Sequence, residues 1–380
     1  MKLSTFTYSD TDRAADKRID MKNPDQTLVI LFGPSRLLDS PAPIQSILAS
    51  YPGAAAIGCS SSGEIFGTHI QDDSLVVGLL QFDHTRVRTA SAPVKDPGHS
   101  FEAAQTLATQ LMGPGLRGVL VLSDGLGVNG SELIRGLNSV LPTDVVVTGG
   151  LAGDGDRFTR TWVIRDGLPV GGYVTAVGLY GTAIRLTHGS KGGWDLFGPE
   201  RLITRSRENV LFELNHKPAL QLYKDYLGEL AKGLPGTALH FPLAIRQKQT
   251  ETKRLVRTIL AIDDTAQSLT FAGDMPEGSY AQFMRANFDR LIQGASDAAT
   301  LASPNGTDAS PTLSIAISCV GRRMVLGQRT EEEVEAAFDV LPKGSAQIGF
   351  YSYGEISPYA TGHCDLHNQT MTITTISEAA

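Results

Sequence analysis

Short apolar runs alternate with helical patterns along the first 140 residues of the chain. The apolar runs are bounded by glycine, proline and polar residues, as strands are, and the stretches between them repeat apolar positions at helical spacing. We expect strands at Thr27–Phe32, Ala54–Gly58, Ser74–Phe82 and Gly118–Ser123, and helices at Ile44–Ala49, Phe101–Met112 and from near Ser131 to before Pro142. This rhythm predicts an α/β fold.

From Val145 onward the pattern changes to glycine-punctuated strands, which are typical of antiparallel sheets. We place a domain change between Gly181 and Gly198, and therefore expect two related sheet-and-helix domains, 1–183 and 184–380, of mixed α+β class. In the second domain the pattern predicts helices at Pro218–Ala231, Tyr280–Ile292 and Glu331–Leu341, an exposed loop at Gly294–Pro311 and a buried strand at Thr312–Gly321.

Composition narrows the classes of partner. The chain has 380 residues, of which 41% are hydrophobic, and 33 Lys and Arg stand against 40 Asp and Glu, for a net charge of −7. No block of basic residues could follow a phosphate backbone, so nucleic acid is not an expected partner. No apolar run is long enough for a signal peptide or a membrane span, so we expect a cytoplasmic protein without a membrane partner.

A nine-residue motif occurs twice. Ile57–Ile65 reads IGCSSSGEI and Ile348–Ile356 reads IGFYSYGEI, identical at six of nine positions. A weaker pair is Val119–Gly125 and Ser314–Gly321, both apolar strands that end at serine and glycine. These repeats predict two related halves with the two GEI corners in equivalent positions, related by an approximate two-fold operation.

The residue types of the motif suit ligand contact. Glycine lets the backbone approach a ligand closely and small hydroxyl residues supply hydrogen bonds. Glu64 and Glu355 either pair with an arginine and lock the halves together or contact a ligand. The aromatic side chains of the second copy either stack on a planar ligand or belong to the core. The candidate ligand-binding residues from the two copies are Cys59, Ser60, Ser61, Gly63 and Glu64, with Phe350, Tyr351, Tyr353 and Glu355.

Several segments together resemble the FIST family over nearly the whole chain: IGCSSSGEI, TGGLAGDGDRF, GGWDLFGPERLITRS, CVGRRMVLGQRTEEE, GFYSYGEI and LHNQTMTIT. The resemblance implies an N-terminal and a C-terminal FIST domain that bind a small ligand and report to signalling enzymes. Stand-alone members include nitric-oxide-sensing haem proteins called NosP, which act on a partner histidine kinase or cyclic-di-GMP enzyme. The resemblance therefore implies a gas or small-molecule ligand and a partner of that kind.

If the cofactor is haem, the iron needs an axial ligand, and histidine is a common one. His240 lies at a strand entrance between apolar residues and is the first candidate. His367 is the second, with hydrogen bonding to loop backbone as its alternative role.

Further candidates follow from charge and position. Arg322 and Arg323, after a predicted buried strand, and Arg257, on another, could clamp a carboxylate, and we expect only one of the adjacent pair to be functional. The pocket is expected between the domains, lined by the two GEI corners, the loop with Cys319, and the segment with Gly149, Gly150 and Asp154. The alternatives are a haem-free sensor of amino acids or small carboxylates and a cysteine-dependent enzyme. The three scattered cysteines predict neither a disulfide nor a shared metal.

Overall fold

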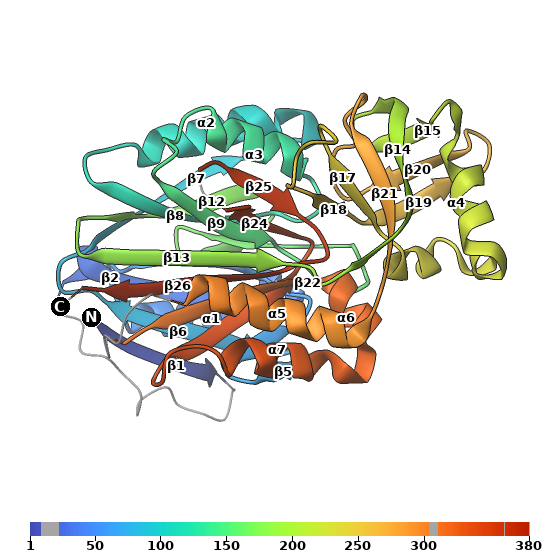
Figure 1. Cartoon of the computed structure of the whole chain (residues 1–380). Coiled ribbons are helices and arrows are strands. Elements are labelled where there is room, and N and C mark those ends of the chain that lie inside the picture. The colour runs from blue at the N-terminus through green and yellow to red at the C-terminus, as the bar shows by residue number, and fades with distance from the viewer. Residues whose placement is uncertain (9–22, 304–310, 361, 380) are drawn as a thin grey trace.

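Four sheets organise the protein. The computed structural model describes residues 1–8, 23–303, 311–360 and 362–379. Three six-stranded sheets with their helices form a three-sheet body, and an eight-stranded sheet lies at one end of it (Figure 1). The mixed α/β class that the pattern predicts is confirmed.

The three six-stranded sheets share one strand order and one pattern of strand directions. In each, two parallel strands at the centre are flanked by antiparallel neighbours on both sides. The first sheet is β1 (Lys2–Tyr8), β6 (Leu75–Gln81), β2 (Thr27–Gly33), β3 (Ala55–Ser60), β10 (Val163–Arg165) and β11 (Leu168–Val170). The second is β7 (Arg86–Pro93), β12 (Tyr173–Tyr180), β8 (Leu116–Ser123), β9 (Val146–Leu151), β24 (Gly354–Pro358) and β25 (Cys364–His367). The third is β13 (Ile184–Lys191), β26 (Met371–Glu378), β22 (Leu313–Cys319), β23 (Ala346–Ser352), β4 (Glu64–Phe66) and β5 (His69–Gln71).

Each sheet receives its last two strands from another part of the chain. The hairpin that follows β3 joins the third sheet, the hairpin that follows β23 joins the second, and the hairpin that follows β9 joins the first. This exchange runs in a cycle over three sheets. The expectation of two halves related by a two-fold operation is therefore corrected: the body contains three related sheets. The two GEI corners are equivalent as predicted, and the corner at Gly149 to Gly153 is the third.

A ring of backbone hydrogen bonds joins the three corners. Ser62 N donates to Tyr351 O at 2.9 Å, Gly153 N to Ser60 O at 3.0 Å and Tyr353 N to Leu151 O at 3.1 Å. Within this ring each corner donates one bond to another corner and accepts one from the remaining corner; Tyr351 N also donates to Gly63 O at 2.9 Å.

A glycine at the same place in each corner permits close strand pairing. A Cβ on Gly58, Gly149 or Gly349 would lie 2.4, 1.8 or 1.8 Å from a carbonyl oxygen of the neighbouring parallel strand. Real Cβ atoms do not approach that closely, so only glycine fits at these positions without a shift of the backbone. The glycines thus carry a steric requirement of the fold.

The core of the three-sheet body lies where the inner faces of the sheets meet. Apolar side chains from all three contribute to one cluster, among them Ile30, Leu122, Ile315 and Phe350, and all are buried. Burial on both faces explains why the central strands read as continuous apolar runs.

Helices cover the outer faces of the sheets. In Figure 1, α2 and α3 lie over the second sheet, α5 lies beside β13 and β26 of the third, and α7 lies beside α5 and β5. The helices are α1 (Ala42–Ala49), α2 (Ser100–Leu111), α3 (Gly130–Asn138), α4 (Ala219–Leu227), α5 (Phe288–Ala302), α6 (Val320–Leu326) and α7 (Thr330–Phe338). No helix among the described residues is long and apolar enough to cross a membrane.

In the sequence, the eight-stranded sheet lies between β13, which belongs to the third sheet, and α5, which packs on β13. Its strands are β18 (Leu255–Arg257), β17 (Leu243–Arg246), β21 (Tyr280–Arg285), β14 (Asp195–Arg207), β15 (Val210–Leu214), β20 (Ser268–Phe271) and β19 (Ile259–Asp263), with β16 (Lys217–Pro218) beside β15. We call residues 195–285 the inserted unit. It has its own core around Tyr223 and Phe271, and α4 packs against it.

Two expectations about this region are wrong. Tyr280–Arg285 is a strand and not the start of a helix, since Ala281 and Phe283 alternate toward the core at the period of a strand. The segment from Gly294 to Ala302 is helical and not a loop. Its Ala and Gly residues form the buried face of α5, where small side chains allow close packing, and residues 304–310 lie outside the described part.

Candidate functional site

The two GEI glutamates lie in equivalent buried sites. Glu64 accepts hydrogen bonds from the backbone and hydroxyl of Ser74, at 3.1 and 3.2 Å. Glu355 accepts from the backbone and hydroxyl of Thr370, at 3.2 and 2.9 Å, and from Ser352 Oγ at 2.7 Å. These partners correct the expectation that the glutamates pair with an arginine.

The environment has the same electrostatic effect on both carboxyls. Burial raises the pKa of Glu64 and that of Glu355 to about 8, although hydrogen bonds from serine and threonine act in the opposite direction. Each glutamate therefore connects its corner to the residue just before a long strand: Ser74 precedes β6 and Thr370 precedes β26. Neither glutamate lines a cavity described below.

Most other residues of the repeated motif belong to the core. Cys59, Ser60 and Tyr351 are buried, Gly63 packs under the Arg323 guanidinium, and Phe350 stacks on Phe32 with ring centroids 4.7 Å apart. Gly150 packs between the second and third sheets, and Ser61 Oγ accepts a hydrogen bond from Gly63 N. Burial raises the pKa of the Cys59 thiol, so this group is a neutral thiol.

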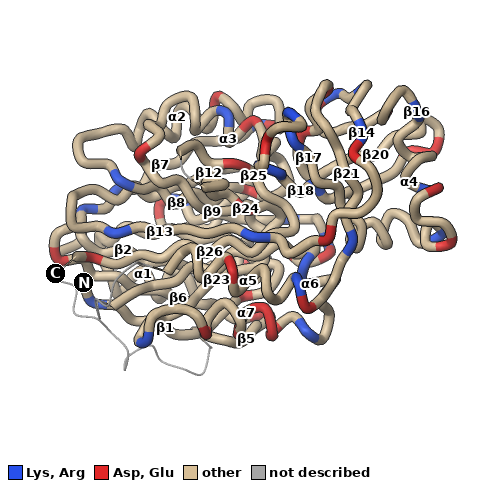
Figure 2. Tube along the Cα trace, viewed as in Figure 1, with Lys and Arg blue, Asp and Glu red and all other residues tan. Residues whose placement is uncertain are grey.

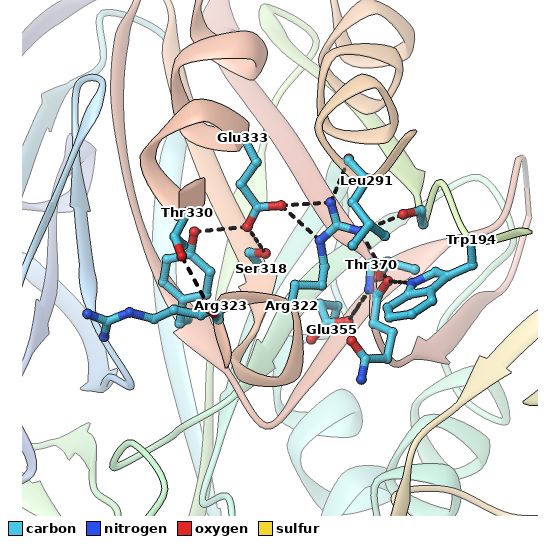
Figure 3. Close-up of polar contacts among 12 residues, drawn as sticks. Trp194, Leu291, Ser318, Arg322, Arg323, Thr330, Glu333, Glu355 and Thr370 are labelled. Carbon is cyan, nitrogen blue, oxygen red and sulfur yellow. Dashed lines mark hydrogen bonds and ion pairs between the residues drawn. The ribbon is translucent and has the colours of Figure 1, made fainter. Parts of the chain in front are cut away.

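Arg322 forms a buried ion pair (Figure 3). Its Nε and Nη2 donate to Glu333 at 2.9 and 2.7 Å, and its remaining N–H groups donate to the carbonyls of Gly192, Leu291 and Gln369. All five guanidinium donors are therefore used. Neither Arg322 nor Glu333 is exposed, so the pair joins α6 to α7, and Arg322 also joins α6 to α5 and to the segment that precedes the inserted unit.

The other two arginine candidates have different positions. Arg323 donates two hydrogen bonds to Asp72, at 2.9 and 2.7 Å, and its side chain points away from that of Arg322 (Figure 3). Arg257 is buried, and its guanidinium donates to the carbonyls of Val256, Asp274 and Leu366. Burial lowers the pKa of Arg257 to about 10.

Asp154 organises the loop that follows the third corner. Its carboxylate accepts from the backbone N–H groups of Phe158, Thr159 and Arg160 and from the Tyr353 hydroxyl. Burial alone would raise its pKa, but these hydrogen bonds hold the pKa below the usual value. The loop places the Phe158 ring on Tyr353, with centroids 4.6 Å apart.

A cavity of about 550 Å³ lies between the three-sheet body and the inserted unit. Its volume is within the range of small-molecule sites. The body contributes Gly125, Leu126, Asn129, Leu151, Phe158, Cys319, Val320, Met324 and Tyr353, among others, and the inserted unit contributes Glu208, Asn209, Gly236, Leu239, Thr258, Leu260, Phe271 and Asp274, among others. Of the predicted site residues, the structure therefore brings Cys319 and Tyr353 to this cavity.

Comparison with known families decides the family. The FIST N domain model matches residues 27–217 and the FIST C domain model matches residues 219–358. The chain belongs to the FIST family. FIST domains are small-ligand sensor domains in signal transduction. The division at residue 184 that the sequence indicates stays a prediction.

Comparison with individual proteins adds little to the family assignment. No curated protein matches the chain. Among solved structures, a cyanuric acid hydrolase from A. caulinodans is 8% identical, with 100% of this chain and 99% of that chain covered and a TM-score of 0.35.

The two histidine candidates of this FIST protein lie outside the cavity wall. His240 is partly buried beside Leu239, which lines the cavity, and burial lowers the pKa of its imidazole. His367 is buried, one ring nitrogen lies 3.0 Å from Ser357 O, and burial lowers its pKa to about 4. Both imidazoles are therefore neutral at pH 7.

Neither histidine that the sequence offers as a haem ligand lies on the cavity wall. Among the described residues that line it there is no histidine, and no lysine or arginine that could hold a propionate. Burial raises the pKa of the Cys319 thiol well above its usual range, so a thiolate ligand is not available either. Haem bound elsewhere through His240 or His367 stays a prediction. No group of three or more His, Cys, Asp or Glu that could hold a metal ion occurs in the described parts of the chain.

Sequence reasoning missed the half of the cavity that the inserted unit supplies. Thr258, Phe271 and Asp274 lie in strands and turns with no motif, and each reaches the cavity through long-range packing. The sequence signal here is the stretch FAGDMPEG, whose glycine and proline residues indicate a turn but do not indicate a ligand site.

Proposed function

We propose that this FIST protein is a sensor whose small-molecule ligand binds in the cavity between the three-sheet body and the inserted unit. The observation that carries the proposal is that both parts of the molecule supply the cavity wall. A ligand that contacts both parts stabilises one arrangement of them over others. Such a differential affinity is the requirement for a ligand to change what a partner recognises.

The contacts between the two parts are of two kinds: polar bonds, and an apolar cluster in which Ala244, Val256 and Met284 of the inserted unit pack with Leu291, Val325 and Leu326 of the body. Asp274 N donates to Ser131 Oγ at 3.0 Å, Arg257 donates to Leu366 O at 3.0 Å, and Lys253 pairs with Asp365. The three polar contacts can be broken without opening the main core of either part, because the cores around Ile30 and around Tyr223 are separate.

The partner we propose is a signalling enzyme, a histidine kinase or a cyclic-di-GMP enzyme, on the strength of the family. Lys and Arg are interspersed with Asp and Glu along the trace, without a long basic tract (Figure 2). This distribution supports a protein partner over nucleic acid.

A cavity-blocking variant tests the ligand site. Gly236 lines the cavity, and a Cβ built on it meets no atom within 4 Å, so Gly236→Trp can cover the mouth without a backbone shift. A small-molecule library is screened by thermal shift against the wild type, Gly236→Trp and the control Lys232→Trp, which alters an exposed residue of the neighbouring turn.

We expect hits that raise the melting temperature of the wild type and the control by a few degrees at about 100 times Kd, and that fail with Gly236→Trp. Equal shifts in all three proteins would refute the cavity as the site. Haemin is included in the screen: a Soret band that His240→Ala or His367→Ala abolishes would establish haem at a second place.

A further inference from the structure

The charge of the cavity wall is one-sided. Two carboxylates, Glu208 and Asp274, line it, and none of the described lining residues is lysine, arginine or histidine. Arg257 lies on the other side of Asp274: both line the neighbouring cavity, and the Arg257 guanidinium donates to the backbone carbonyl of Asp274. Burial raises the pKa of the Asp274 carboxyl, and the charge of Arg257 acts in the opposite direction. A ligand in the cavity therefore meets two carboxyl groups and no lysine, arginine or histidine among the described lining residues.

Two polar groups on this wall lack partners. Asp274 Oδ1 is buried and has no hydrogen-bond partner among the described residues, and the same is true of Thr258 Oγ1, whose residue is 4% exposed. A buried acceptor without a partner destabilises the protein. Both atoms are covered in this arrangement, so a ligand that turns these side chains toward the cavity and donates to both recovers that free energy. Both residues line the cavity.

The rest of the wall is apolar and aromatic. Phe158 stacks on Tyr353, and Phe271 is buried on the side of the inserted unit. Aromatic faces attract cations as well as flat rings. A ligand with a planar apolar group and a positively charged nitrogen matches each of these features.

We infer that the cavity selects an organic cation, an aromatic amine whose ammonium group donates to Asp274 and Thr258 while its ring lies among Phe158, Tyr353 and Phe271. This rests on the proposed function, because it names the ligand class of the same cavity. A carboxylate ligand would bring a like charge to Glu208 and Asp274 and would find no lysine, arginine or histidine among the described lining residues to pair with, and such a juxtaposition is disfavoured. The chemistry thus argues against an amino acid or small carboxylate as the ligand.

The test uses three probes that share an indole ring and differ in charge: tryptamine, tryptophol and indole-3-propionate. Their binding to the full chain is measured by isothermal titration and by ligand-observed NMR at neutral pH. The variants are Asp274→Asn, which removes the charge at nearly constant shape, and Asp264→Asn, which makes the same change at an exposed site of the inserted unit.

We expect tryptamine to bind at least tenfold more tightly than tryptophol, and indole-3-propionate not to bind. Asp274→Asn should abolish the preference for tryptamine and leave tryptophol unchanged, whereas Asp264→Asn should change neither. Melting curves of both variants confirm that they are folded.

Equal binding of tryptamine and tryptophol, tighter binding of the carboxylate, or an unchanged preference in Asp274→Asn would overturn the cation inference and leave the cavity as a ligand site. If none of the probes binds at millimolar concentration, the aromatic-amine class is wrong. The proposed function itself fails only by the separate Gly236→Trp experiment, so the two failures are distinguishable.

Discussion

Replacing Arg322 by methionine should destabilise the protein strongly, because it leaves Glu333 buried without its cation. The carboxylate would keep only hydrogen bonds from Ser318 Oγ at 3.0 Å and Tyr351 Oη at 2.9 Å. Three backbone carbonyls would lose a donor at the same time.

The magnitude follows from the burial of both partners. Removing one partner of a buried ion pair costs about 3–5 kcal/mol, against about 0–1 kcal/mol for an exposed pair. Arg322 and Glu333 are both fully buried, so the larger range applies. With a urea m-value of about 3 kcal/mol/M, the unfolding midpoint should fall by roughly 1–1.7 M.

The assay can report on this region specifically. The chain has two tryptophans, and Trp194 Nε1 donates at 2.8 Å to Gln369 O, the same carbonyl that accepts from Arg322 (Figure 3). In a Trp162→Phe background, urea unfolding followed by fluorescence therefore monitors the immediate surroundings of the pair.

A double variant, Arg322→Met with Glu333→Leu, provides the control. Replacing both charges by apolar groups removes the stranded carboxylate, so the double variant should be more stable than Arg322→Met alone. A loss below about 1 kcal/mol for Arg322→Met, or a double variant that loses the sum of the two single losses, would refute the reasoning.

Three other properties should follow from buried groups. The pKa of Glu64 and of Glu355 is about 8 in the folded state against about 4.5 when unfolded, so the stabilising protonated form is fully present below pH 4.5 and is lost as pH rises through 8. Between pH 6 and 8, the free energy of unfolding measured with urea should fall by about 1.4 kcal/mol per pH unit for each of the two carboxyls. Replacing both Glu64 and Glu355 by glutamine should flatten this slope. Gly149→Ala should cost several kcal/mol in the same assay, while Gly236→Ala, which adds its Cβ in open space, should be close to neutral; equal losses would contradict the steric argument. Because burial raises the pKa of Cys319, the folded protein should react slowly with Ellman's reagent at pH 8 and react fully in urea, and fast reaction before unfolding would contradict a neutral thiol.

The central strands and most helices were predictable from local pattern. Thr27–Gly33 and Leu313–Cys319 are buried on both faces, and strands of this kind are recognisable as continuous apolar runs in the sequence. The repeated GEI motif likewise indicated equivalent corners, since matched small and acidic residues meet matched steric and hydrogen-bonding requirements.

Three-membered symmetry was not visible in the sequence because the third corner keeps only the glycine. At Gly149 a steric requirement persists, whereas the glutamate and its hydroxyl partner are absent from the following residues. The exchange of hairpins among the sheets is likewise a matter of long-range backbone pairing, which leaves no local signal.

The site depended on tertiary structure for a further reason. The residue types at Arg322, Glu64 and Glu355 are compatible with a ligand site or a buried network, and only their neighbours decide between these roles. The cavity wall joins Tyr353 to Asp274 and Thr258, which lie about 80 or more positions apart in the chain. Sequence alone therefore determined the family and the central strands, whereas packing between the body and the inserted unit decided which side chains a ligand can reach. Exposure to a cavity is a property of contacts and not of residue type.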